Sequence, residues 1–136
     1  MAGARPGRRR PSHRREDRPD PRRALGAAGE ALVAQWFEAN GYEIVDRNWR
    51  CRDGELDLVV AAPGVLVFCE VKTRRDNAFV APYEAVTPAK QRRIRRLAVR
   101  WLGARNMRAR SIRFDVASVV HERGHAPVVD VIPNAF

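Results

Sequence analysis

The sequence has few cysteines and no long hydrophobic run, and both absences narrow its class. Its 136 residues include only two cysteines, Cys51 and Cys69, which are too few for a disulfide framework and favour a reducing compartment. The longest apolar run, Leu58 to Cys69, is interrupted by Pro63-Gly64 and is too short to span a bilayer. No apolar signal segment follows the charged N-terminus. We therefore expect a cytoplasmic protein with no membrane partner.

Lysine is nearly absent, although the chain is strongly basic. Of 26 basic residues only Lys72 and Lys90 are lysine, and the formal net charge is +10. A lysine at position 72 runs against this bias, which indicates that a compact point charge is needed there. The excess of positive charge favours a polyanionic partner such as nucleic acid, or is the solvated surface charge of an arginine-rich chain.

Apolar side chains are almost missing from residues 1–23, which hold nine arginines and four prolines. This composition predicts a disordered basic tail. The tail either adds nonspecific nucleic-acid affinity or is a neutral extension. The following residues, 24–136, have the length of a single domain with a usable core.

The first half of this domain predicts one helix followed by three strands. Apolar residues recur at helical spacing from Ala24 to Asn40, and Gly41 suits the position after a helix. Tyr42 to Arg50 has β-propensity. Gly54 to Thr73 contains two β-rich runs around Pro63-Gly64, which favour a tight turn with positive φ at the glycine. We expect a three-stranded antiparallel meander.

The second half predicts a helix and further strands. Thr87-Pro88 is a favourable helix start, and helical spacing continues to about Ala104. Ser111 to Val120 alternates as a strand, and Pro127 to Ile132 predicts a short edge strand. Because a helix joins Ser111–Val120 to the hairpin, we expect this strand to lie parallel to a neighbour. The predicted fold class is α/β, with a mixed sheet flanked by helices.

The hairpin carries the chemically distinctive residues. With Pro63 and Gly64 in the loop, Asp57 lies opposite Glu70 and Glu55 opposite Lys72, which places all four charged residues on one face. Like charges about 5 Å apart repel by roughly 3 kcal/mol at an effective dielectric constant of 20. A divalent cation between the two acids would offset this repulsion, and Mg²⁺ prefers carboxylate and carbonyl ligands. The alternative is a solvated hairpin face.

The opposite face of the hairpin is predicted to be apolar and buried. In the same register three apolar pairs share it, namely Leu56 with Val71, Leu58 with Cys69, and Val60 with Val67. A slip of one residue would move each side chain to the other face and separate the acids. A further carboxylate, Glu30, lies at the edge of the apolar stripe of the first helix. It is either half buried beside a site or a routine boundary residue.

Two groups of arginines are candidates for contacts with phosphate. The first group follows the hairpin, in a loop that runs to Val86 and also carries Phe79 and Tyr83. The second lies on the polar face of the second helix. Such residues can hold a nucleic-acid backbone, although a solvated helix surface is the alternative. The candidates are Arg74 and Arg75 in the loop and Arg92, Arg93, Arg96 and Arg100 on the helix.

The segment His121-Glu122-Arg123-Gly124-His125 formally matches the zinc-protease pattern HExxH. That chemistry requires both histidines on consecutive turns of a helix. Gly124 and Pro127 oppose a helix, and the segment follows a predicted strand, so we expect a turn. The two cysteines lack a CxxC spacing, which argues against a metal pair or a cysteine nucleophile.

Asp57 followed by Glu70-Val71-Lys72 resembles the motif of the PD-(D/E)XK nucleases, and the predicted element order matches the restriction-endonuclease-like αβββαβ core of that superfamily. Residues 24–134 more closely resemble the bacterial YraN family, itself regarded as similar to archaeal Holliday junction resolvases. The stretches that carry the resemblance are GAAGEALVAQWFEANGYEIVDRNWR, GELDLVV, FCEVKTR, KQRRI and RFDVASV.

The resemblance implies a metal site. Asp57, Glu70 and the backbone carbonyl of Val71 would bind Mg²⁺ or Mn²⁺. Lys72 would position the attacking water and help to deprotonate it, and Glu30 would complete the cluster through the metal or a water.

Other positions fit the resemblance less closely. Gln91 sits where many superfamily members carry a helix glutamine near the scissile phosphate. The Pro-Asp of the motif is here Leu56-Asp57, and the neighbouring acid Glu55 has no fixed role in it.

The expected function is therefore metal-dependent endonuclease activity on DNA, including branched or otherwise structured DNA. Resolving a junction needs two symmetric active sites, which implies a homodimer. One alternative is a nucleic-acid-binding protein that keeps the fold without cutting. Another is an assembly factor that binds protein or RNA through the basic helix.

Overall fold

The computed structural model describes residue 3, residues 20–75 and residues 86–136. The predicted order of elements is confirmed, with a short fifth strand at the end. The elements are α1 (Pro21–Ala39), β1 (Glu43–Cys51), β2 (Gly54–Ala62), β3 (Val65–Arg75), α2 (Pro88–Arg105), β4 (Ser111–His121) and β5 (Val128–Ile132).

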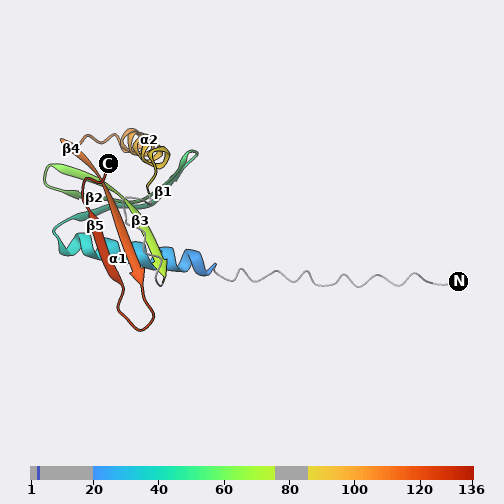
Figure 1. The fold of residues 1–136 in the computed structure, drawn as a ribbon. Coiled ribbons are helices and arrows are strands. Elements are labelled where there is room, and N and C mark those ends of the chain that lie inside the picture. Colours follow the sequence, from blue (N-terminus) through green and yellow to red (C-terminus); the bar gives the residue numbers. More distant parts are fainter. Residues whose placement is uncertain (1–2, 4–19, 76–85) are drawn as a thin grey trace.

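The five strands form one mixed sheet in the order β1-β2-β3-β4-β5. Neighbours are antiparallel except for β3 and β4, which are parallel as predicted. A parallel pair needs a crossover connection, and α2 lies in that connection. The two helices cover opposite faces of the sheet (Figure 1). The architecture is α/β and is consistent with a restriction-endonuclease-like core.

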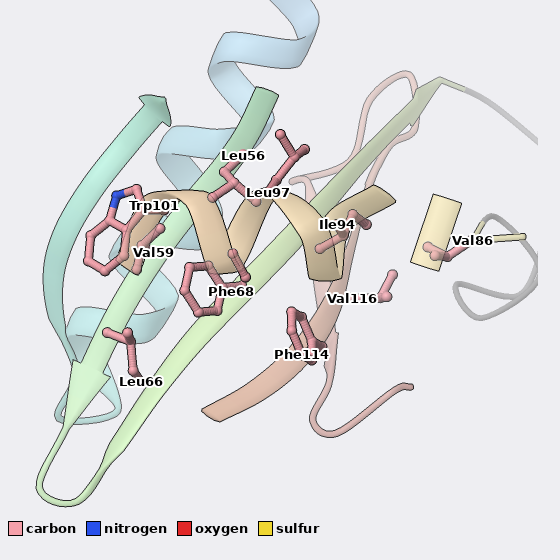
Figure 2. Packing of buried hydrophobic residues seen from close by; sticks show 11 residues of the cluster. Leu56, Val59, Leu66, Phe68, Val86, Ile94, Leu97, Trp101, Phe114 and Val116 are labelled. Atoms are coloured by element: carbon pink, nitrogen blue, oxygen red, sulfur yellow. The ribbon is translucent and has the colours of Figure 1, made fainter. Parts of the chain in front are cut away.

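Each face of the sheet has its own apolar core. The α2-side cluster joins that helix to the sheet through aromatic and aliphatic side chains (Figure 2). Its members are Leu56, Val59, Leu66, Phe68, Val86, Ile94, Leu97, Ala98, Trp101, Phe114 and Val116. The α1-side cluster consists of Val33, Ala34, Phe37, Leu58, Val60, Val67, Cys69, Ala117 and Val119. Burial on both faces explains why β2 and β3 are so apolar toward their turn.

The predicted turn and helix cap are both confirmed. Gly64 has φ of 79°, and the strands on either side pair from Ala62↔Val65 to Leu58↔Cys69, which is the predicted register. At the start of α2, the Thr87 hydroxyl accepts a hydrogen bond from the Lys90 N–H at 3.3 Å. Local residue chemistry therefore sets these two boundaries.

Helix α1 begins three residues earlier than predicted. The Asp20 carboxylate accepts a hydrogen bond from the Arg22 N–H at 3.0 Å, and Pro21 occupies the first turn, where its missing N–H costs nothing. Residues 21–23 are thus helical rather than part of the predicted tail. The tail prediction for residues 1–2 and 4–19 lies outside the described residues.

The loop predicted to run from Arg74 to Val86 begins later than predicted. Arg74 and Arg75 belong to β3, while Phe79 and Tyr83 lie outside the described residues.

Within the part of the chain that the structure describes, neither helix has a stretch long and apolar enough to cross a lipid bilayer.

Candidate active site

Strands β2 and β3 separate at the acidic end of the hairpin. Their ladder ends at Leu58↔Cys69, although β2 continues beside β1 to Gly54 and β3 continues beside β4 to Arg75. Asp57 fills the opening between them. Its Oδ2 accepts a hydrogen bond from the Val71 N–H at 2.9 Å, so a carboxylate takes the place of a strand partner.

The predicted alternation of β2 fails next to Asp57. Leu56 belongs to the α2-side cluster and Leu58 to the α1-side cluster, whereas a regular strand would place both on one face. The predicted pairing of Leu56 with Val71 is therefore wrong. On the neighbouring strand, Asn48 has φ of 50° and lies between the pairs that join β1 to Leu58 and Leu56, so the irregularity of β1 accompanies that of β2.

The sequence predicted that the four charged residues of the hairpin share one face of the sheet, and this prediction is wrong. Glu55 and Asp57 line hollows together with residues of α1. On β3, Cys69 and Val71 pack on the α1 side, and strand alternation directs Glu70 and Lys72 to the other side. The acids meet because the opening between the strands lets Asp57 reach Glu70.

Four carboxylates converge around this opening. Oxygens of Glu30, Glu55 and Asp57 all lie within 4.8 Å of one another. Glu70 lies close enough to Asp57 to share a hydrogen bond with it, and the Lys72 Nζ lies 3.3 Å from the Glu70 Oε1. The structure thus brings together Glu30, Asp57, Glu70 and Lys72, and the Val71 backbone lies beside them.

The environment opposes negative charge on these acids. Burial, with the adjacent charge of Glu70, raises the pKa of Asp57 from 3.8 to about 8, although the Val71 N–H opposes the shift. Burial also raises the pKa of Glu30, an effect that its hydrogen bond with Asn48 partly offsets. A divalent cation would favour the ionised forms. A set of carboxylate oxygens fits Mg²⁺ or Mn²⁺.

Sequence reasoning gave no role to two residues of the site. Glu55 joins the acid group, and the Arg50 Nε donates to its Oε2 at 3.1 Å. Asn48 holds Glu30 by a side-chain hydrogen bond. The alternation of Glu55 with Asp57 in the sequence was a signal from which the place of Glu55 in the acid group could have been predicted. For Asn48 the sequence offers only the general tolerance of asparagine for positive φ.

Two adjoining hollows open on the acids. The smaller, of about 80 Å³, reaches Asp57, and the larger, of about 440 Å³, lies toward the start of α1. Both include Ala27, Glu30 and Asn48 in their walls. The remaining residues are Ala31, Arg47, Asp57 and Leu58 in the smaller hollow, and Arg23, Gly26, Arg50 and Glu55 in the larger.

The structure records other contacts for the remaining predicted site residues. The Gln91 Nε2 donates to the Val86 carbonyl at 3.2 Å, which places this amide in the first turn of α2. Arg75 lines a separate hollow beside His121. The predicted arginines of α2 are all exposed, on the helix that covers the sheet face opposite α1 (Figure 1). They are Arg92, Arg93, Arg96 and Arg100, the last paired with Asp53 at 2.6 Å.

The HExxH segment has no zinc-protease geometry. His121 ends β4, and the next residues form a turn in which the His125 N–H donates to the Glu122 carbonyl at 3.1 Å. The predicted turn is confirmed.

Cys69 is buried, and burial raises the pKa of its thiol well above the usual range, which opposes a thiolate nucleophile.

Comparison with known sequences places these residues in a shared region. A family described as "Uncharacterised protein family UPF0102" matches residues 29–119, a range that contains Glu30, Asp57, Glu70 and Lys72. A UPF0102 protein of Beutenbergia cavernae is 52% identical over 107 residues, covering 79% of this chain and 91% of that protein. One of Nocardia farcinica is 50% identical over 115 residues, covering 85% and 91%. One of Pelobacter propionicus is 45% identical over 121 residues, covering 88% and 86%.

Proposed function

The chain belongs to the uncharacterised protein family UPF0102, whose name assigns no activity. From the geometry of the acids in this chain, we propose that the protein is a metal-dependent endonuclease that hydrolyses DNA phosphodiesters. One observation carries this proposal. Glu30, Glu55, Asp57 and Glu70, from α1, β2 and β3, converge on one opening in the sheet, with Lys72 beside them. The resemblance of these residues to the PD-(D/E)XK motif supports it.

Asp57, Glu70 and the Val71 carbonyl would hold Mg²⁺ or Mn²⁺, with Glu30 completing the set. The bound ion would activate a water and neutralise charge on the phosphate. Glu70 fixes the Lys72 ammonium at 3.3 Å, where it can orient the attacking water. Attack forms a new bond from the water oxygen to phosphorus and breaks the bond to the leaving oxygen of the strand.

The resemblance to junction resolvases extends the proposal to branched DNA and to a homodimer. Two symmetric sites would allow paired cuts across a junction. Basic residues would hold the phosphate backbone, so binding should weaken steeply with salt and show little sequence preference.

A cleavage assay tests the proposal. Supercoiled plasmid and a four-way junction are incubated with the protein in Mg²⁺, in Mn²⁺ or in EDTA. We expect cutting that requires the cation and falls by about 10²–10³-fold in Asp57→Asn and in Lys72→Gln, since each removes a group that acts on the reacting phosphate. Arg108→Gln, an exposed residue beside the Pro63-Gly64 turn at the other end of the hairpin, serves as the control. Cutting that persists in EDTA or in Asp57→Asn would refute the site.

A nucleic-acid-binding protein without catalysis is the second candidate. The exposed arginines of α2 favour it, because they can bind phosphates without the acids. This candidate predicts salt-sensitive DNA binding that is equal in the wild type and in Asp57→Asn, with no cutting in either cation.

A further inference from the structure

We propose that the larger hollow, between α1 and β1, is the cleft that binds the phosphate backbone of the substrate, with Arg23 and Arg50 as its basic contacts. The inference deepens the proposed nuclease function and rests on it. It assigns the binding surface to the α1 side of the sheet rather than to the basic face of α2.

The position of this cleft connects it to the acids. Its volume is about 440 Å³, and its walls come from the first turns of α1, the end of β1 and the start of β2. Glu30 and Asn48 belong both to this cleft and to the smaller hollow that contains Asp57. A strand lying in the cleft would therefore reach Glu30, Glu55 and Asp57 without crossing the sheet, while Glu70 lies at the opening where Asp57 contacts it.

The two arginines of the cleft are suited to phosphate. Arg23 is exposed in the first turns of α1. Arg50 uses its Nε to hold Glu55 at 3.1 Å, while its side chain stays 72% exposed. A guanidinium has five N–H donors, so this one can hold Glu55 and still present donors to a phosphate oxygen. Arginine matches phosphate by paired hydrogen bonds.

The remaining walls favour a backbone over a base. Gly26 and Ala27 form the α1 side of the cleft, and a Cβ built on Gly26 would meet nothing within 4 Å. A strand can thus approach the helix closely. Among the described residues that line the cleft none is aromatic, so bases find no stacking partner there. The volume falls within the usual range for a single ligand, about 300–1,000 Å³, which suits a short stretch of one strand.

The arginines of α2 provide a matched comparison. Arg92 and Arg96 are exposed and lie about one helical turn apart on α2, the helix that covers the opposite face of the sheet from α1 (Figure 1). Removing two charges there changes the net charge of the protein as much as removing two charges in the cleft. Any difference between the two double variants therefore reports position rather than total charge.

The test measures binding of a short, fluorescently labelled single-stranded DNA by anisotropy, in Ca²⁺ and again in EDTA, over a series of salt concentrations. For Arg23→Gln/Arg50→Gln we expect Kd to rise by about tenfold or more. We also expect the slope of log Kd against log salt to fall by about one to two, because each phosphate contact on a single strand contributes about 0.7. For Arg92→Gln/Arg96→Gln we expect a change in Kd below about threefold. Equal losses, or a larger loss in the α2 variant, would overturn the assignment.

Arg23→Gln alone separates binding from the state of the acids, because Arg23 has no part in the Arg50–Glu55 pair. The Kd of this variant for DNA should rise by about threefold or more, and no rise would overturn the role of Arg23.

Cleavage by the same proteins in Mg²⁺ separates the two proposals. If DNA binding depends on Arg23 and Arg50 but the wild type does not cut DNA, the nuclease proposal is refuted and the proposal of a DNA-binding cleft stands. A wild type that cuts, with both cleft variants binding and cutting normally, would refute the cleft alone. A wild type that binds no DNA would refute both.

Discussion

Asp57 is a carboxylic acid in a position where the ionised form is unfavourable. Burial and the neighbouring Glu70 raise its pKa to about 8, and the Val71 N–H offsets only part of this. In the cation-free protein Asp57 is therefore largely protonated at neutral pH. In the proposed function a cation would balance this charge, and the site would then exchange stability in the free state for affinity in the bound state.

The stability of the cation-free protein should depend on pH through Asp57. Because the pKa is higher in the folded protein than in the unfolded chain, the native state binds more protons, and its free energy of unfolding falls as pH rises from about 4 through 8. Asp57→Asn removes the part of this dependence that comes from Asp57. We expect the variant to be more stable than the wild type by about 1–2 kcal/mol at pH 8 and equal to it near pH 4. Urea unfolding in EDTA at both pH values measures this, and a less stable variant at pH 8 would contradict it.

Helix α1 holds Glu30 over the site by packing unusually close to β3. A Cβ at Gly29 would lie 2.0 Å from the Thr73 Oγ1, and Gly29 itself is buried. The glycine therefore sets the distance between the helix and the strand. Glu30 follows it directly in the sequence, so this distance also positions a carboxylate.

Replacing Gly29 by alanine should push α1 away from the sheet. We expect Gly29→Ala to lower the free energy of unfolding by about 1–3 kcal/mol, the usual range for overpacking. Gly103→Ala is the control, because a Cβ there meets nothing within 4 Å and alanine favours a helix by about 0.8–1 kcal/mol over glycine. Urea unfolding should move the two variants in opposite directions. A stabilised Gly29→Ala would show that α1 does not depend on this contact.

Element order, the Pro63-Gly64 turn and the start of α2 could be predicted because each depends on a few adjacent residues. The placement of Leu56 could not. It depends on a break in alternation beside Asp57 that accompanies the positive φ of Asn48 on the neighbouring strand, and no local pattern in β2 reports it. Asn48 was missed for a related reason, since its role arises only where α1 and β1 meet. Glu55 was placed among the charged residues of the hairpin but was given no role in the site.

A buried ion pair joins distant parts of the chain. Asp115 is 0% exposed and accepts two hydrogen bonds of 2.8 Å from Arg113. The same guanidinium donates to the Tyr42 hydroxyl at 2.9 Å, and the Asn134 N–H donates to Asp115 at 3.0 Å. Strand β4 is thus linked to the residue before β1 and to the C-terminal segment.

Breaking this pair should affect the whole fold. We expect Asp115→Ala to lower the free energy of unfolding by about 3–5 kcal/mol, because it leaves Arg113 without its buried partner. Glu38→Ala, which removes a partner of the exposed Arg47 at 3.7 Å, should cost less than about 1 kcal/mol. Urea unfolding compares them. Equal losses would mean that the buried pair adds no more than a surface contact.

The central claim is that Asp57, Glu70 and Glu30 together bind a divalent cation. Calorimetric titration of the cation-free protein with Mn²⁺ at pH 7 tests this claim most directly. Two buffers of different ionisation enthalpy report the protons released. Because Asp57 is protonated in the free protein and must ionise to bind a metal, we predict binding to the wild type with release of about one proton, and loss of both binding and release in Asp57→Asn. Absence of binding to the wild type, or unchanged binding in Asp57→Asn, would contradict the account.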